Sequence, residues 1–261
     1  MNTDLHGKNA LVGGGSKGIG KAIAWALASL GANVTLMSRS ADLMAAIIKE
    51  MPRSSGQDHD FLIADYADSQ DLDIKIKGLV SEKTIHILIN NTGGPAGGAI
   101  FEATPEAFQA AFHNHIICNQ LLVQAIVPGM VKEDYGRIIN IISTSVKAPL
   151  DNLGVSNTIR AAVANWAKTL SNELGRYGIT VNNVLPGMTE TERLWEIIEN
   201  NAKQSGLDVD AVKERMKREI PLRRFAKPEE IAAAAAFLAS PAAAYITGTN
   251  ITVDGGRTRS W

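Results

Sequence analysis

Ser156 and Arg160 are the two residues whose types and spacing most directly suggest chemistry in this sequence. They stand four positions apart in "GVSNTIRAAV", so on a helix they lie one turn apart on one face. Ser143 ends the apolar run "RIINIIS" and supplies a second hydroxyl. A serine hydroxyl is an alkanol, with a pKa near the roughly 15.7 of water, and a guanidinium stays protonated. This set can orient an oxygen or hold an anion, but it exchanges protons poorly at neutral pH.

A second pattern is the glycine-rich stretch "LVGGGSKGIGKAIAWALA". Gly14, Gly18 and Gly20 stand between an apolar run and a segment with helical spacing. Glycines let a backbone approach a pyrophosphate closely, and the N-terminus of the following helix offers free N–H groups and a positive dipole end. A glycine turn alone is a weak signal, but a strand before it and a helix after it are what a dinucleotide site requires. We therefore predict phosphate binding at this turn.

Apolar β-type runs recur between helical segments along the whole chain, and these elements must position the residues above. The runs are nearly continuous in Val, Ile and Leu rather than alternating, as expected for strands that are covered on both faces. Their alternation with helices predicts an α/β fold with a doubly wound parallel sheet of about seven strands and right-handed crossovers. The predicted strands are 9–14, 33–38, 61–65, 85–90, 137–143, 179–185 and 250–253.

Residues 190–220 are the one marked shift in composition, because this segment is charged and helical and follows the predicted sixth strand. It is either a solvated amphipathic helix pair or a lid over the carboxyl edge of the sheet. Its position favours the lid, since the ligands of such sheets bind at that edge. No linker or internal repeat divides the chain, so we treat residues 1–261 as one domain.

The composition argues against several classes of protein. The net charge of −1 gives no global attraction to nucleic acid or to an anionic membrane. The N-terminus has no apolar signal-peptide core, and no run of about 18 apolar residues occurs. Cys118 is the only cysteine, which excludes an internal disulfide and a cysteine-based zinc cluster, and its apolar neighbours predict a buried thiol. We expect a cytoplasmic protein with no metal, no membrane partner and no nucleic-acid partner.

Several motifs occur together and in a fixed order. They are Gly14-x-x-x-Gly18-x-Gly20, "NNTGG" after the predicted fourth strand, "PGMTET" after the sixth, and the run "IPLRRFAKPEEIAAAAAFLASPAAAYITGTNITVDGG". With them the chain resembles the short-chain dehydrogenase/reductase family, in particular its 3-oxoacyl-acyl-carrier-protein-reductase-like members, over about residues 6 to 256. The resemblance implies a single Rossmann-type domain that binds NAD or NADP, and a dimer or tetramer.

The resemblance also implies which residues contact the cofactor. Asp65 resembles the aspartate beside the adenine, and Asn91 and Gly93 resemble the turn along the adenosine ribose, although Thr92 replaces the usual alanine. The loop after the sixth strand resembles the one that holds the nicotinamide carboxamide and the phosphates. The full set of predicted cofactor contacts is Gly14, Ser16, Lys17, Gly18, Ile19, Gly20, Ser38, Arg39, Asp65, Tyr66, Asn91, Gly93, Arg160, Pro186, Gly187, Met188 and Thr189.

The end of the predicted second strand, "LMSRS", discriminates between the two cofactors. It carries Ser38 and Arg39 and no carboxylate before Asp42. A carboxylate there would bond the adenosine ribose of NAD, whereas an arginine accommodates the 2′-phosphate of NADP. Lys17 in the glycine turn adds a second cation, although both side chains could also be plain surface charges. We predict NADP(H), with NAD(H) disfavoured.

The catalytic positions depart from the family pattern. In the family a tyrosine exchanges the proton, a lysine grips the nicotinamide ribose, a serine orients the substrate oxygen and an asparagine holds a water. Ser143 matches the serine, but Ser156 and Arg160 stand where "YxxxKAAL" has its tyrosine and lysine. His115 falls at the asparagine position, unless a one-residue shift restores Asn114. A serine proton costs roughly 7 kcal/mol more to remove than a phenol proton, because about five pKa units separate them.

Three interpretations of this altered set stay open. In the first, the protein transfers a hydride between NADP(H) and a small-molecule carbonyl or alcohol, and the acid is His115, His113 (reference pKa about 6.5) or a water held by the serines. In the second, Ser143, Ser156 and Arg160 form a pocket for an anionic or phosphorylated substrate. In the third, the protein binds NADP without turnover, as a sensor or oligomer partner. We favour the first, with Ser143, Ser156, Arg160 and His115 as the catalytic set.

The quaternary structure is expected through the resemblance alone. In the family the long helices, here 105–132 and 153–176, commonly pack against those of a partner. We expect a homotetramer or a dimer.

Overall fold

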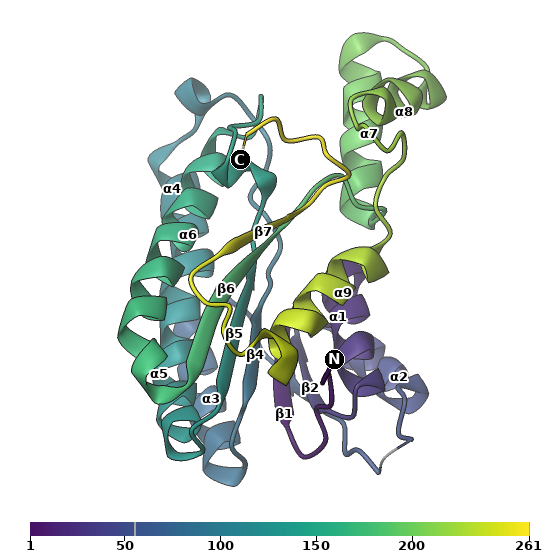
Figure 1. Cartoon of the computed structure of the whole chain (residues 1–261). Helices are drawn as coiled ribbons and strands as arrows, with labels where there is room; N and C mark the ends of the chain where they lie inside the picture. The colour runs from purple at the N-terminus through teal and green to yellow at the C-terminus, as the bar shows by residue number, and fades with distance from the viewer. Residues whose placement is uncertain (55, 261) are drawn as a thin grey trace.

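The seven apolar runs form one sheet of parallel strands in the order β3-β2-β1-β4-β5-β6-β7 (Figure 1). The computed structural model describes residues 1–54 and 56–260. The strand order reverses between β1 and β4, which is where the loops of such sheets diverge and leave room for a ligand. The predicted doubly wound fold is confirmed. The strands are β1 Asn9–Gly13, β2 Asn33–Ser38, β3 Asp60–Ile63, β4 Ile87–Asn90, β5 Gly136–Ile141, β6 Ile179–Pro186 and β7 Asn250–Val253.

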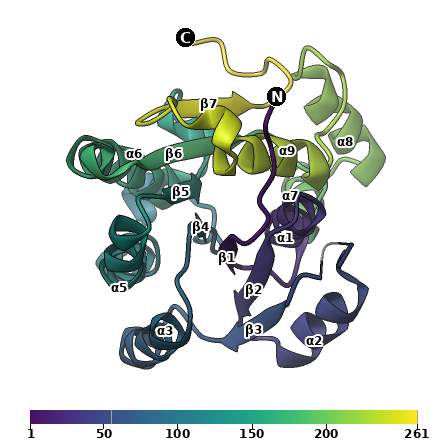
Figure 2. The ribbon, with the colours of Figure 1, turned by 60° about the horizontal axis from the view of Figure 1, so that its bottom comes forward.

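Helices cover both faces of this sheet. Figure 2 shows α1, α2 and α9 on one face and α3, α5 and α6 on the other. Within the described ranges, no helix combines the length and the apolarity that crossing a bilayer needs. The helices are α1 Gly18–Ser29, α2 Ala41–Glu50, α3 Ser69–Glu82, α4 Pro105–Phe112, α5 Cys118–Lys132, α6 Gly154–Leu174, α7 Glu192–Ser205, α8 Val209–Arg218 and α9 Pro228–Ala239; a π-helical turn, His113–Ile117, joins α4 to α5.

Successive residues of the central strands enter two different cores. In β1, Ala10 and Val12 pack in the core with α1, α2 and α9, whereas Leu11 packs in the core with α3, α5 and α6. A strand covered on both faces needs an apolar side chain at every position, which explains the continuous runs in the sequence. Cys118 is buried in the second core, as predicted.

Four asparagines form a hydrogen-bonded ladder across β4, β5, β6 and β7; the first three are buried and Asn250 is half-buried. Asn90 donates to Asn140 at 2.9 Å, Asn140 donates to Asn183 at 2.8 Å, and Asn183 donates to Asn250 at 2.8 Å, each bond joining a side-chain Nδ2 to the next Oδ1. The same residues are direct partners in the strand register. Each amide inside the core thus finds a partner only in this register. The ladder fixes how far each strand extends toward the carboxyl edge of the sheet.

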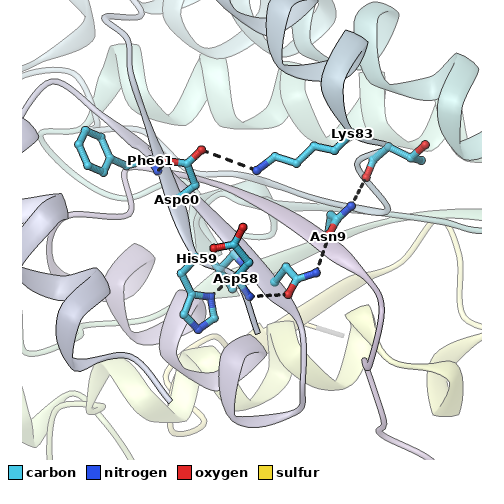
Figure 3. Close-up of polar contacts among 9 residues, drawn as sticks. Asn9, Asp58, His59, Asp60, Phe61 and Lys83 are labelled. Carbon is cyan, nitrogen blue, oxygen red and sulfur yellow. Dashed lines mark hydrogen bonds and ion pairs between the residues drawn. The ribbon is translucent and has the colours of Figure 1, made fainter. Parts of the chain in front are cut away.

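A second polar network ties the strand beginnings together at the opposite edge (Figure 3). The side chain of Asn33 donates to Asn9 at 2.9 Å and accepts from the backbone N–H of Asp58 at 2.9 Å. Lys83 and Asp60 approach to 3.8 Å. These contacts satisfy polar groups at the amino ends of β1, β2 and β3. Ligands of such sheets bind at the other edge, at the carboxyl ends of the strands.

The segment predicted as an insertion forms the helix pair α7 and α8, which stands beyond the carboxyl ends of the strands (Figure 1). The pair has a small core of its own, in which Leu194, Ile198, Val212, Met216 and Phe225 are buried. The charged residues of the segment therefore cover the outside of an amphipathic pair, and the pair lies where a lid would lie.

The asparagine ladder yields a stability prediction. Asn140→Ala leaves the side-chain N–H of Asn90 and the side-chain oxygen of Asn183 without partners inside the core, so we expect the free energy of unfolding to fall by about 2–4 kcal/mol. Urea unfolding measures this change. Asn172→Ala, at an exposed position of α6, is the control and should change stability by less than about 0.5 kcal/mol. Equal losses for the two variants would contradict the role of the ladder.

Candidate active site

The glycine turn between β1 and α1 places no side chain of its own at Gly14, Gly18 and Gly20, around the N-terminus of α1. Gly14 and Gly18 have φ angles of 57° and 51°, in the left-handed region that glycine adopts without strain. A Cβ atom on Gly20 would lie 2.2 Å from the carbonyl oxygen of Gly14, so no larger residue fits there. The N-cap residue Lys17 forms no side-chain cap bond, and the first N–H groups of α1 stay available to an anion. The turn fits the pyrophosphate of a dinucleotide.

The charged side chains predicted at the adenosine end lie near this turn. Arg39 Nη1, just after β2, lies 3.8 Å from Asp65 Oδ2, just after β3. Lys17 Nζ lies 2.8 Å from Glu192 Oε2 at the start of α7. Both pairs are exposed and contribute little to stability, so either cation can exchange its carboxylate for a phosphate.

Asn91 connects the end of β4 to the glycine turn, because its Nδ2 donates to the carbonyl oxygen of Gly13 at 3.0 Å. The loop that follows β4 is bonded to the start of α6. The Gly98 N–H donates to the Asn152 oxygen at 2.7 Å, and the Gly154 N–H donates to the Gly98 oxygen at 3.2 Å. The loop with the predicted ribose contacts thus closes directly over the helix that carries Ser156 and Arg160.

The loop after β6 is held by backbone bonds at the same edge. The Gly187 N–H donates to the Val253 oxygen at 2.9 Å, and the Ala226 N–H donates to the Met188 oxygen at 2.9 Å. Thr189 is buried, and its hydroxyl donates to the Gly187 oxygen at 3.1 Å. The loop therefore lies at the carboxyl edge of the sheet, and the Thr189 hydroxyl is engaged inside the loop.

Two serine hydroxyls are free to donate at the carboxyl edge. Ser143 follows β5, and its Oγ accepts a hydrogen bond from the Ser145 N–H at 3.1 Å, which leaves the hydroxyl proton unused. Ser156 lies in the first turn of α6, and its hydroxyl has no partner in the part of the chain that the structure describes. Both side chains are only half-buried, so a small molecule can reach them.

Arg160 carries a buried positive charge at the centre of the site. The residue is 8% exposed, and its Nη1 donates to the carbonyl oxygen of Ile141 at 3.0 Å. Its Nη2 lies 3.5 Å from the place that a Cβ on Gly94 would take. Burial lowers the pKa of Arg160 to about 10, so the guanidinium remains charged at neutral pH. No carboxylate among the described residues pairs with it, and such a charge is costly unless a bound group compensates it.

His115 lies in the π-helical turn and is 2% exposed. Burial and the charge of Arg160 lower the pKa of His115 to about 3, and a hydrogen bond with the Gly93 backbone opposes this only in part. The imidazole is therefore neutral at pH 7. This contradicts the expectation that His115 titrates near neutral pH and serves as the protonated acid. Nε2 of His113 is buried and has no hydrogen-bond partner among the described residues.

None of the four tyrosines replaces the missing phenol. Tyr66 is buried under the glycine turn, with its hydroxyl 2.7 Å from the place that a Cβ on Gly13 would take. Tyr135 lies just before β5, Tyr177 follows the far end of α6, and Tyr245 is fully exposed. The predicted cofactor contact of Tyr66 can therefore involve its backbone only.

Comparison with known proteins agrees with this arrangement. Residues 14–258 match a family model described as enoyl-(acyl carrier protein) reductase. A 3-oxoacyl-[acyl-carrier-protein] reductase of Synechocystis sp. is 36% identical over 259 residues, which cover 97% of this chain and 98% of the relative. The chain is a member of the short-chain dehydrogenase/reductase family. The resemblance seen in the motifs is thereby confirmed.

Two further members of the family bind or use NADPH according to their names. The NADPH-dependent reductase BacG of Bacillus subtilis is 31% identical over 255 residues, covering 97% of this chain and 98% of the relative. The crystal structure of L-sorbose reductase from Gluconobacter frateurii, complexed with NADPH and L-sorbose, has a TM-score of 0.93 with 30% identity and covers 100% of both chains.

The structure also shows two contacts that the sequence did not predict, both between α7 and the site. Arg193 Nη2 donates to the carbonyl oxygen of Pro95 in the loop after β4 at 3.1 Å, and Glu192 pairs with Lys17 as described above. Each contact joins residues far apart in the sequence, and one partner is a backbone oxygen. No local pattern could have identified them.

The burial of His115 yields a prediction about stability and pH. Between pH 3 and 6.5 the unfolded chain binds a proton at His115 that the folded chain does not bind, so the free energy of unfolding must fall as the pH falls through this range. His115→Asn removes this contribution and should reduce the slope by up to roughly 1.4 kcal/mol per pH unit. Urea unfolding from pH 4 to 8 measures the slope, and the wild type and variant should run parallel above pH 7.5. A His115 NMR titration with a pKa above 5.5 would contradict the account.

Proposed function

We propose that this protein is an NADP(H)-dependent oxidoreductase that transfers a hydride between the nicotinamide and a small molecule with a carbonyl or hydroxyl group. The observation that carries this proposal is the glycine turn, where a Cβ on Gly20 would strike the Gly14 oxygen and the helix N-terminus is uncapped. NADPH-dependent relatives that span nearly the whole chain support it. Residues 1–261 would act as one nucleotide-binding domain.

The cofactor would be held at three places along the carboxyl edge. The turn from Gly14 to Gly20 would hold the pyrophosphate, and Arg39 with Lys17 would hold the 2′-phosphate, while Asp65 stands beside the adenine. Asn91 and Gly93 would follow the adenosine ribose. The contacts to the nicotinamide end would come from Arg160, Pro186, Gly187, Met188 and Thr189.

In the proposed mechanism a bound NADPH supplies a hydride, and the side chains of this chain handle the oxygen of the substrate. Ser143 and Ser156 donate hydrogen bonds to that oxygen. The Arg160 guanidinium holds positive charge beside it. The Ser143 and Ser156 hydroxyls are alkanols and His115 is neutral, so none of these three side chains replaces the phenol as an acid. Water held by the two serines would supply the proton.

The helix pair α7 and α8 would serve as a lid over this site. The Lys17–Glu192 pair and the Arg193–Pro95 hydrogen bond support the assignment, because they fasten the start of α7 to the glycine turn and to the loop after β4. A phosphate that takes over Lys17 would release Glu192, so cofactor binding and lid position would be linked.

We also propose that the protein forms a homotetramer or a dimer through α4, α5 and α6. Phe112 is 43% exposed and Ile117 is 40% exposed on the α4–α5 helix, and a partner helix packed there would cover both. Sedimentation velocity at micromolar concentration should show an oligomer. A monomer at that concentration would count against the proposal.

The choice of NADP(H) leads to a mutational prediction. Arg39→Gln should weaken NADPH binding by 10- to 100-fold, equivalent to about 1.4–2.8 kcal/mol, and leave NADH binding nearly unchanged. Isothermal titration calorimetry with both cofactors measures this. The control is Arg53→Gln, since Arg53 is an exposed arginine after α2 whose guanidinium donates to the Ile48 oxygen. Similar affinities of the wild type for NADPH and NADH would overturn the preference.

The alternative, an NADP-binding protein without turnover, predicts a different outcome. Such a protein binds NADPH tightly and oxidises it with no carbonyl compound of a broad panel. Steady-state assays at 340 nm on the wild type, run beside the calorimetry, separate the two.

A further inference from the structure

No carboxylate of residues 1–54 or 56–260 neutralises the charge of Arg160, and the nicotinamide end of a dinucleotide does not neutralise it either. The residue is 8% exposed, and within the described ranges the guanidinium donates one hydrogen bond, to the neutral carbonyl of Ile141. The nicotinamide is neutral when reduced and positive when oxidised, and its ribose hydroxyls are neutral. A guanidinium has five N–H donors, so it can bond a ribose hydroxyl and still face another ligand. The ligand that suits it is an anion formed from the substrate.

The groups around Arg160 favour an anion and provide no acid. His115 is neutral. Both residues contact the loop after β4, because His115 forms a hydrogen bond with the Gly93 backbone and Nη2 of Arg160 approaches Gly94. Ser156 lies one turn before Arg160 on the same helix, and Ser143 follows the strand whose Ile141 oxygen accepts from Arg160. The site therefore combines one fixed cation with two free hydroxyl donors, which is the composition of an oxyanion hole.

The acidity of the product decides which substrate such a site can serve. Hydride addition to an isolated ketone gives an alkoxide, whose conjugate acid has a pKa near the roughly 15.7 of water and which needs a proton in the same step. Hydride addition to the double bond of a conjugated enone gives an enolate. Its charge is delocalised as in a phenolate, whose conjugate acid has a pKa of about 10. The enolate oxygen is therefore less basic than the alkoxide oxygen by roughly five pKa units, and a fixed cation with hydroxyl donors can hold it until water arrives.

We propose that Ser143, Ser156 and Arg160 form an oxyanion site, and that the preferred substrate is an α,β-unsaturated carbonyl compound that is reduced at its carbon–carbon double bond. This inference rests on the proposed function and names its substrate class. The hydride from a reduced nicotinamide forms a C–H bond at the β-carbon. The π electron pair of the double bond moves to the enolate, whose oxygen faces Arg160. Water then protonates the α-carbon, so one enone, one reduced nicotinamide and one proton give one saturated ketone and one oxidised nicotinamide.

The first test needs neither cofactor nor turnover. The full-length protein is titrated with 4-nitrophenol, whose absorbance shows whether the bound form is the phenol or the phenolate. We expect the phenolate to bind at least tenfold more tightly than the phenol. Arg160→Gln should abolish that preference and Arg160→Lys should retain part of it. The control is Arg176→Gln, at an exposed arginine beyond the other end of α6, and it should behave as the wild type does. Equal binding of phenol and phenolate, or a preference that survives in Arg160→Gln, would overturn the proposal.

The second test compares a matched pair of substrates. With NADPH, 2-cyclohexenone should be reduced at least 100-fold faster than cyclohexanone, and mass spectrometry should identify cyclohexanone as the product. Formation of the allylic alcohol, or faster reduction of cyclohexanone, would overturn the proposal. NADPH binding without reduction of 2-cyclohexenone would overturn it as well and leave the cofactor assignment intact. A failure of NADPH to bind would instead overturn the proposed function. The phenolate titration would still test the oxyanion site, because it needs no cofactor.

A double variant tests whether the missing acid sets the substrate class. Ser156→Tyr with Arg160→Lys restores a phenol and a lysine at the two positions, and we expect the ratio of cyclohexenone to cyclohexanone reduction to fall by at least tenfold. Circular dichroism and NADPH affinity show whether the variant is folded. An unchanged ratio in a folded variant would contradict the explanation based on acidity.

Discussion

This active site depends on a positive charge that is buried with no counter-ion among the residues that the structure describes. Arg160 can be held in place because β5 ends at Ile141, whose carbonyl oxygen accepts its Nη1, and because the glycines after β4 leave room beside its Nη2. Burial, together with this charge, keeps the neighbouring His115 neutral. The guanidinium also makes the site attractive to anions. A site built in this way stabilises charge well and transfers protons poorly.

The rest of the fold gives that charge a fixed place. The groups around it come from the ends of β4 and β5 and from α6, so their spacing depends on the register of the strands. The asparagine ladder sets this register with one side-chain amide in each of four strands, three of them buried in the core. The loop after β4 is bonded to the start of α6 and also to α7, through Pro95 and Arg193. The loop after β4 and the start of α6 are therefore positioned by hydrogen bonds as well as by side-chain packing.

Much of the fold and the outline of the site could be predicted from the sequence, because they follow from local rules. Continuous apolar runs mark strands buried on both faces, and the glycine turn marks the approach of a phosphate. The π-helical turn at His115 was not predictable, since "HNHII" contains neither glycine nor proline to mark an irregular helix. The burial that lowers the His115 pKa, and the absence of a carboxylate near Arg160 among the described residues, are properties of packing. Lys17 and Glu192 lie far apart in the sequence, so no periodic pattern of residues predicts that they pair.

A crystal structure of the protein with NADPH and 4-nitrophenolate would test the central claim most directly, because it shows what the Arg160 guanidinium faces when both ligands are present. The account predicts the phenolate oxygen within roughly 3 Å of an Arg160 nitrogen and of the Ser143 or Ser156 hydroxyl. It would be contradicted by a structure in which all the remaining N–H groups of Arg160 bond the cofactor and the phenolate lies elsewhere.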